Sequence, residues 1–165
     1  MTIDATVSGA NSDSYCDVAY ADAYHLTRGF NDEWAAADTN AKEIVLKWAT
    51  RLLDRLNWMS PRTLQLQALR WPQMDAYDQD GWPVLQTVIH KNVKDAACEM
   101  ALYLLREDRT IDSGAIGIDS LKVGPIAIDF SQTAGTKSIP NGVTDLIAHF
   151  LAGGGSSVVH SLGRA

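Results

Sequence analysis

The stretch NAKEIVLKWATRLLDRL, residues 40–56, decides the fold class. From position 45 to position 56 its apolar side chains recur at i, i+3, i+4, i+7, i+8 and i+11, which is the spacing of one buried stripe on an amphipathic helix. Asn40 or Thr39 is expected to cap the helix. The helix is expected to end near Asn57, because the Ser60-Pro61 pair opposes its continuation.

The same periodicity appears in other parts of the chain. It predicts three more helices, at residues 18–28, 91–106 and 140–151. Residues 64–69 are expected to add one or two helical turns, and residues 30–37 to form a loop that docks Trp34. The sequence therefore predicts a mainly α fold, a small bundle of about four helices.

The period changes from 3.6 to 2 after Gly114. Apolar and polar side chains then alternate in two short runs, which are separated by Gly124-Pro125. This pattern predicts a β-hairpin insertion over about residues 116–131. Its apolar positions are Leu121, Val123, Ile126 and Ile128.

Composition suggests one helical domain with flexible termini. Residues 1–14 are small and polar and are expected to form a flexible N-terminal arm. Residues 15–152 form the predicted domain. Residues 153–165 form a polar tail that begins with three consecutive glycines, which are expected to act as a hinge.

Charge and cysteine content limit the classes of function. The 165 residues carry a net charge of −6, which disfavours a protein whose main task is to hold nucleic-acid phosphates. Cys16 and Cys98 lack metal-ligand spacing and are predicted to be reduced thiols. We expect no signal peptide and no membrane span, because the required apolar runs are absent.

Residues 69–83, LRWPQMDAYDQDGWP, contain a fragment that resembles a calcium loop. With Gly81 at the sixth position of an EF-hand, the first and twelfth positions would fall on Ala76 and Thr87, which supply no carboxylate. The fragment is therefore interpreted as a tight turn. Trp71 is expected to lie on the helical bundle, whereas Trp82 could face either its own core or a neighbouring subunit.

The sequence contains no other motif that is typical of a catalytic, metal-binding or phosphate-binding site. The four histidines lie on separate elements without zinc-site spacing, and no nucleophile elbow or phosphate-binding glycine loop occurs. We therefore expect no enzyme activity, no catalytic residue, no metal and no cofactor.

One region combines basic and aromatic residues. Its basic residues are Lys47, Arg51, Arg55, Arg62 and Arg70, and its tryptophans are Trp48, Trp58 and Trp71. Such a combination can bind single strands by charge and stacking. In the alternative interpretation, Trp48 belongs to the core and the arginines face solvent or a neighbouring subunit, because a positive edge could meet a negative edge in a ring.

An ordered set of short motifs resembles a known family. The set consists of Ser14-Tyr15, Tyr20-Ala21-Asp22-Ala23-Tyr24, Arg28-Gly29, Trp34, Ala49-Thr50-x-x-Leu53-Asp54, Gln67-Ala68-Leu69-x-Trp71-Pro72, Asp80-Gly81, Ala96-Ala97-Cys98-Glu99-x-Ala101, Leu121-Lys122-Val123-Gly124 and Ile139-Pro140-x-x-Val143. Together these motifs resemble the head–tail connector (neck adaptor) proteins of tailed bacteriophages. Sequences of this kind are also labelled DnaT-like single-stranded-DNA-binding proteins.

The resemblance implies a structural role in the virion. Connectors of this kind form a ring, commonly of twelve copies, beneath the portal protein. The ring extends the channel through which genomic double-stranded DNA passes without specific binding, and it joins the head to the next neck or tail protein. It implies a location at the head–tail junction after assembly in the host cytoplasm, with no membrane partner.

Two sets of contact residues follow from this interpretation. The tail is expected to dock on the portal through Gly153, Gly154, Gly155, Val158, Val159, Leu162 and Arg164. Contacts with neighbouring subunits or the next ring are expected from Arg51, Arg55, Trp82, Leu121, Val123, Ile126 and Ile128. The alternative function is single-stranded-DNA binding in replication, through Arg51, Arg55, Arg62, Arg70 and exposed tryptophans.

Overall fold

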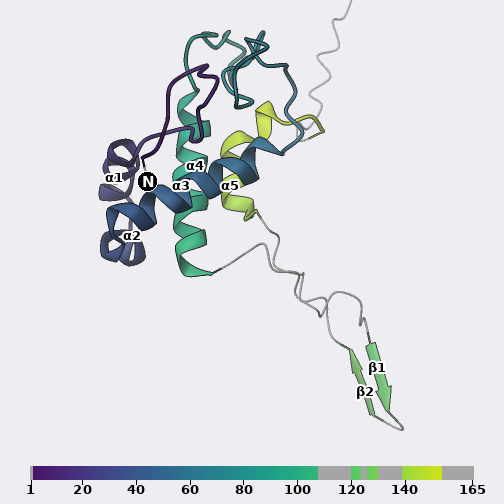
Figure 1. The fold of residues 1–165 in the computed structure, drawn as a ribbon. Coiled ribbons are helices and arrows are strands. Elements are labelled where there is room, and N and C mark those ends of the chain that lie inside the picture. The colour runs from purple at the N-terminus through teal and green to yellow at the C-terminus, as the bar shows by residue number, and fades with distance from the viewer. Residues whose placement is uncertain (1, 108–119, 124–125, 130–138, 154–165) are drawn as a thin grey trace, which may run out of the picture.

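The computed structural model of the chain describes residues 2–107, 120–123, 126–129 and 139–153, with the backbone alone for 120–123 and 126–129 (Figure 1). These residues are mainly helical, as the sequence predicted. The helices are α1 (Val18–Leu26), α2 (Asp32–Ala36), α3 (Thr39–Asp54), α4 (Lys91–Arg106) and α5 (Asn141–Ile147), followed by the short 3₁₀ helix η1 (Ala148–Phe150).

Helix α4 is the centre of the packing. It contacts each of the other four α-helices, and in Figure 1 α3 crosses it while α5 lies beside it. Its alanines Ala96, Ala97 and Ala101 are fully buried. Their small side chains allow the neighbouring backbones to approach closely, so the apolar stripe of α4 becomes the core of the domain.

The predicted helices agree with the structure to different degrees. The α4 bounds are those predicted, whereas α1 ends at Leu26 rather than at position 28. Helix α3 begins one or two residues earlier than the predicted caps Thr39 and Asn40 imply, because Asp38 caps it by accepting a hydrogen bond from the Ala41 backbone N–H at 2.7 Å, and it ends at Asp54 rather than near Asn57. The final helical segment is divided between α5 and η1.

Two local predictions were wrong. Residues 32–36, expected to lie in a loop, form α2, which buries Trp34 against the domain. Residues 64–69, expected to be helical, form turns and bends instead. Gln67 is buried there, and its amide nitrogen donates to the carbonyls of Leu69 and Pro72 at 2.8 and 2.9 Å. These side-chain bonds satisfy backbone groups that a helix would have paired differently.

The N-terminal segment, predicted to be a flexible arm, packs on the domain instead. The Lys47 ammonium group on α3 donates to the Thr2 carbonyl at 2.9 Å and pairs with the Asp13 carboxylate at 2.6 Å. The Ala68 backbone N–H donates to the Gly9 carbonyl at 3.0 Å. Residues 2–14 are therefore tied both to α3 and to the loop that follows it.

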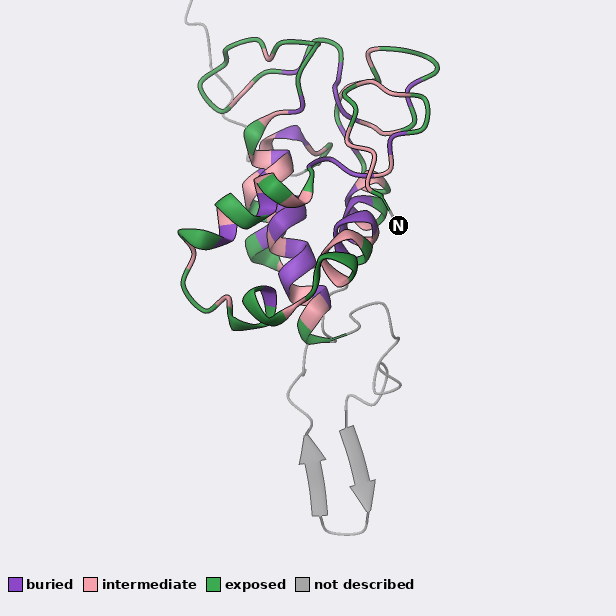
Figure 2. Cartoon of the chain, turned by 60° about the vertical axis from the view of Figure 1, so that its left-hand side comes forward, coloured by how far each residue is buried: buried purple, intermediate pink, exposed green. Residues whose placement is uncertain are grey.

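Residues 57–90 form a long connection at one end of the helices (Figure 2). Its anchor is Trp71, which is 1 % exposed and packs edge-on against Phe150 and Trp58 with ring centroids 4.7 and 5.8 Å away. The prediction that Trp71 lies on the helical bundle is confirmed. The tight turn is confirmed as well, because the Gly81 N–H donates to the Asp78 carbonyl at 3.1 Å.

Two strands are described between α4 and α5. Strands β1 (Ser120–Val123) and β2 (Ile126–Asp129) pair antiparallel, with Leu121 opposite Ile128 and Val123 opposite Ile126. The predicted hairpin insertion as a whole stays a prediction, because residues 116–119, 124–125 and 130–131 lie outside the described residues.

Candidate nucleic-acid interface

The outer face of α3 places two arginines beside a tryptophan. The inward-facing residues of α3, among them Leu46, Ala49 and Leu53, are fully buried. The residues at positions 44, 48, 51 and 55 follow helical spacing along the other side of the helix. Arg51 and Arg55 are exposed there, and Trp48 is half-buried. We call Trp48, Arg51 and Arg55 the arginine face.

The two arginines of this face are not engaged by other side chains. Within the described part of the chain, Arg51 and Arg55 make no ion pair and no side-chain hydrogen bond. By contrast, five other cations pair with carboxylates: Arg28 with Glu99 at 2.6 Å, Lys42 with Asp22 at 2.9 Å, Lys47 with Asp13 at 2.6 Å, Arg106 with Glu33 at 3.0 Å, and Lys91 with Asp95. The guanidinium groups on α3 are therefore available to an anionic ligand.

Arg70 and Arg62 differ from the arginine face in their surroundings. The Arg70 backbone N–H donates to the Asp54 carboxylate at 2.6 Å, so residue 70 is tied to the C-terminal end of α3 beside Arg55. The Arg62 guanidinium donates to the Gln67 carbonyl at 2.8 Å. The structure thus brings Arg70 to the end of α3 that carries Arg51 and Arg55, whereas Arg62 is engaged in its own loop.

The tryptophans expected to stack on a single strand are mostly unavailable. Trp58 and Trp71 are buried, and the Trp58 indole N–H donates to the Leu53 carbonyl at 3.0 Å. This corrects the expectation that exposed tryptophans accompany these arginines. One of the two interpretations of the sequence placed Trp48 in the core, and the structure shows it half-buried and packed against the core. Its i+3 and i+7 spacing to Arg51 and Arg55 is the signal that could have revealed the arginine face.

The most exposed aromatic side chains near this end of the domain lie on another element. Residues 76–84 form a short antiparallel hairpin in which Tyr77 bridges to Pro83, and we call it the Trp82 hairpin. Trp82 is 70 % exposed and Tyr77 56 % exposed. Trp82 therefore does not face its own core. Tyr77 was not singled out from the sequence, although the turn at 78–81 places it beside Pro83.

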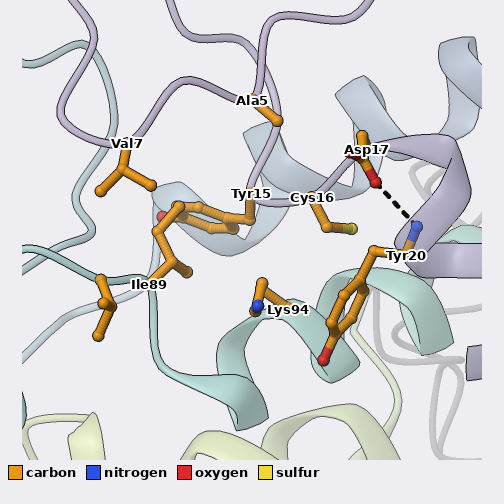
Figure 3. Close-up of a pocket in the computed structure, with 9 residues that line it drawn as sticks. Ala5, Val7, Tyr15, Cys16, Asp17, Tyr20, Ile89 and Lys94 are labelled. Carbon is orange, nitrogen blue, oxygen red and sulfur yellow. Dashed lines mark hydrogen bonds between the residues drawn. The ribbon is translucent and has the colours of Figure 1, made fainter.

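A cavity of about 290 Å³ lies between the N-terminal segment, the start of α1 and the start of α4 (Figure 3). Its polar groups are engaged within the chain. The Lys94 ammonium group lies 4.3 Å from the centroid of the Tyr20 ring, the Tyr20 hydroxyl donates to Asp95 at 2.7 Å, and Asp17 caps α1. Burial raises the pKa of the Tyr20 hydroxyl. The cavity thus offers apolar walls and one cation, but no set of free polar groups.

Both thiols are buried beside this cavity. The Cys16 and Cys98 sulfur atoms lie 3.7 Å apart as free thiols. The hydrogen bond between them and burial raise the pKa of Cys98, so the neutral thiol is favoured. Among the described residues, no group of three or more histidine, cysteine, aspartate or glutamate side chains could hold a metal ion. No helix in the described ranges is long and apolar enough to cross a bilayer.

For most of the residues predicted to dock on the portal or on other subunits, the structure describes no side chain. Gly153 is described and has a φ of +84°, which suits glycine. Gly154, Gly155, Val158, Val159, Leu162 and Arg164 lie outside the described residues. Only the backbone is described for the four apolar strand positions Leu121, Val123, Ile126 and Ile128. Their predicted roles therefore stay predictions.

A comparison with known protein families matches residues 1–165 to the family described as "Putative DnaT-like ssDNA binding protein". The chain belongs to this family. Comparisons with curated proteins and with solved structures found no match. Of the two labels that the sequence motifs suggested, family membership agrees with the DnaT-like single-stranded-DNA-binding protein.

Proposed function

We propose that the chain binds single-stranded DNA through the arginine face of α3, with Arg70 at its edge. The observation that carries this proposal is the pair Arg51 and Arg55, exposed and without a carboxylate partner among the described residues, beside the half-buried Trp48. The description of the family to which the chain belongs supports the same ligand.

The chemistry of the face suits a single strand. Guanidinium groups bind phosphate oxygens through paired hydrogen bonds, and they remain charged at every physiological pH. Arg51 and Arg55 are four residues apart, which corresponds to about 6 Å along a helix. Trp48 is half-buried on the same stripe, and aromatic side chains can stack with unpaired bases.

The overall charge of −6 determines how this binding behaves. A net negative charge opposes phosphate binding on average, so attraction depends on a local group of unpaired cations. Contacts with a small number of phosphates give modest affinity, and each contact lowers log K by only about 0.7 for a tenfold rise in salt concentration. We therefore expect binding that is local, weak at high salt and independent of base sequence.

The direct test uses a fluorescently labelled oligothymidine and measures anisotropy at low salt. The variant Arg51→Gln/Arg55→Gln is expected to bind about 100-fold more weakly, because it loses two charge-assisted contacts that contribute about 1.5 kcal/mol each. The matched control is Lys91→Gln/Arg106→Gln, which removes two cations from α4. An equal loss in the control, or no binding by the wild type, would contradict the proposal.

A head–tail connector is the second candidate function. The observation that favours it is a set of large apolar side chains exposed in the loops at one end of the domain, namely Met59, Leu64, Leu66, Trp82 and Leu85. Such exposure is typical of a surface that a partner covers. In this role the chain would form a ring under a portal protein and let double-stranded DNA pass. Co-sedimentation with the portal, and rings in micrographs, would support it; a chain that stays monomeric with the portal would exclude it.

A further inference from the structure

The Trp82 hairpin presents its side chains from a fixed backbone. The Val84 N–H donates to the Ala76 carbonyl at 2.8 Å, and the Asp78 N–H donates to the Trp82 carbonyl at 2.9 Å. The Asp78 carboxylate closes the tip, because it accepts the N–H groups of Asp80 at 3.0 Å and of Trp82 at 2.8 Å. These bonds fix the backbone from which the exposed side chains project.

This hairpin combines exposed aromatic rings with negative charge. Trp82 and Tyr77 are 70 % and 56 % exposed, and Asp75 and Asp80 are exposed around them. No lysine or arginine occurs in residues 75–84. A partner that covers this surface must offer positive charge beside apolar area. Phosphates are poor partners, because the carboxylates repel them.

The arginine face meets both requirements. Arg51 and Arg55 supply positive charge, while the half-buried Trp48 and the exposed Ile44 supply apolar surface along the same stripe. A guanidinium group can stack on the face of Trp82. It can also bind a carboxylate in the bidentate manner. Within one copy both surfaces remain exposed, so they do not cover one another in the same chain.

We propose that the Trp82 hairpin of one copy docks on the arginine face of a second copy. Trp82 stacks on the guanidinium groups of Arg51 and Arg55, and Asp80 pairs with one of them. Because the two surfaces differ, the contact is heterologous and leads from copy to copy, either into a closed ring or into an open chain. The contact area is small, so the association is weak and dependent on salt.

The contact also has a consequence for the single strand. It occupies the same two arginines that carry the proposed single-stranded-DNA binding, so the two states are mutually exclusive. This part of the inference rests on the proposed function, whereas the contact between copies does not. A single strand is then expected to dissociate the copies by competing for the arginine face.

The test is a charge exchange measured by sedimentation velocity over a range of protein concentrations at low salt. One full-length variant carries Gln79→Arg/Asp80→Arg in the hairpin, and the other carries Arg51→Glu/Arg55→Glu in α3. Each variant alone is expected to associate at least about tenfold more weakly than the wild type. An equimolar mixture of the two variants is expected to associate again, because opposite charges then face each other.

The control is Asp32→Arg/Ala35→Arg on α2, which adds the same positive charge to exposed positions far from both surfaces in the sequence and should leave association unchanged. Circular dichroism checks that each variant is folded. Trp82→Ala provides a second variant that removes an exposed ring without opening the core, and it should weaken association as well. A wild type that remains monomeric at all concentrations, or a mixture that fails to associate, overturns the proposal.

Adding unlabelled oligothymidine to the associating wild type tests the competition. Dissociation of the copies is the expected result. If the oligothymidine binds the protein and the copies stay associated, the shared use of the arginine face is wrong. If the oligothymidine does not bind at all, the proposed function fails while the charge exchange still decides the contact between copies.

Discussion

At the scale of single residues, binding of an anionic ligand depends more on which cations are accessible than on how many cations the chain has. Arg51 and Arg55 are two of fourteen lysines and arginines in a chain of net charge −6. Both are exposed on the outer side of α3, and the neighbouring carboxylate of Asp54 is already engaged. Asp54 accepts hydrogen bonds from the Tyr15 hydroxyl at 2.5 Å and from the Arg70 backbone N–H at 2.6 Å. The guanidinium groups on α3 thus remain free to bind a ligand.

Three histidines are expected to make the fold sensitive to mild acid. Burial lowers the pKa of His25, His90 and His149, and His90 additionally lowers the pKa of His149 through charge repulsion. His90 also caps α4, because its Nδ1 accepts the Asn92 N–H at 3.2 Å. Protonation therefore removes a cap and places charge in apolar surroundings, where it is poorly solvated.

The pH dependence follows from the sign of these shifts. A histidine with a lowered pKa binds fewer protons in the folded state than in the unfolded state. The free energy of unfolding is therefore expected to fall as the pH decreases below about 6.5, the ordinary histidine value, until the folded protein also takes up the proton. Urea unfolding at several pH values between 8 and 5 measures this dependence. In the variant His149→Phe the decrease should be smaller, and an unchanged decrease would contradict the assignment.

At the scale of secondary-structure elements, the start of α3 offers a direct comparison. The sequence contains three consecutive capping candidates, and Asp38 is the one that bonds the Ala41 N–H. Asp38→Ala is expected to lower the free energy of unfolding by about 1 kcal/mol, since a lost cap costs 0.5–2 kcal/mol. Asn40→Ala, at one of the two positions that the sequence suggested, should have a much smaller effect. Chemical unfolding of both variants decides which residue is the cap.

The sequence predicted best the helices in which the residues themselves show a clear helical period. Helices α3 and α4 each present a long apolar stripe, so their existence and approximate bounds were correct. Helix α2 was missed because five residues are too few to show a period. Its helical state depends on Trp34, which stacks on His25 at a centroid distance of 4.4 Å. Residues 64–69 were misassigned because the buried amide of Gln67, rather than local propensity, determines their path.

Part of the candidate interface could be predicted, because that part also lies on a helix with a clear period. The charge pattern identified Arg51, Arg55 and Arg70, whose positions depend on α3 and its end. Burial of Trp71 on the bundle was predicted, whereas burial of Trp58 was not, because Trp58 is placed by its backbone bridge to Leu151 and its ring contact with Trp71. Residues brought together from distant parts of the sequence leave no local signal.

At the scale of the whole molecule, α4 forms the centre of a helical domain, and long loops lie at one end (Figure 1). The N-terminal segment and residues 57–90 pack on that end and place the Trp82 hairpin in solvent. The arginine face lies on the outer side of α3. An acidic chain therefore carries a small cationic surface and a separate acidic, aromatic surface, each suited to a different partner.

The salt dependence of single-stranded-DNA binding tests the account most directly. The logarithm of the binding constant for oligothymidine should fall linearly with the logarithm of the salt concentration. Because each phosphate contact on a single strand contributes a slope of about −0.7, Arg51→Gln/Arg55→Gln should reduce the magnitude of the slope by about 1.4, while Lys91→Gln/Arg106→Gln should leave it unchanged. A slope that is the same in the wild type and in the arginine-face variant would contradict the account.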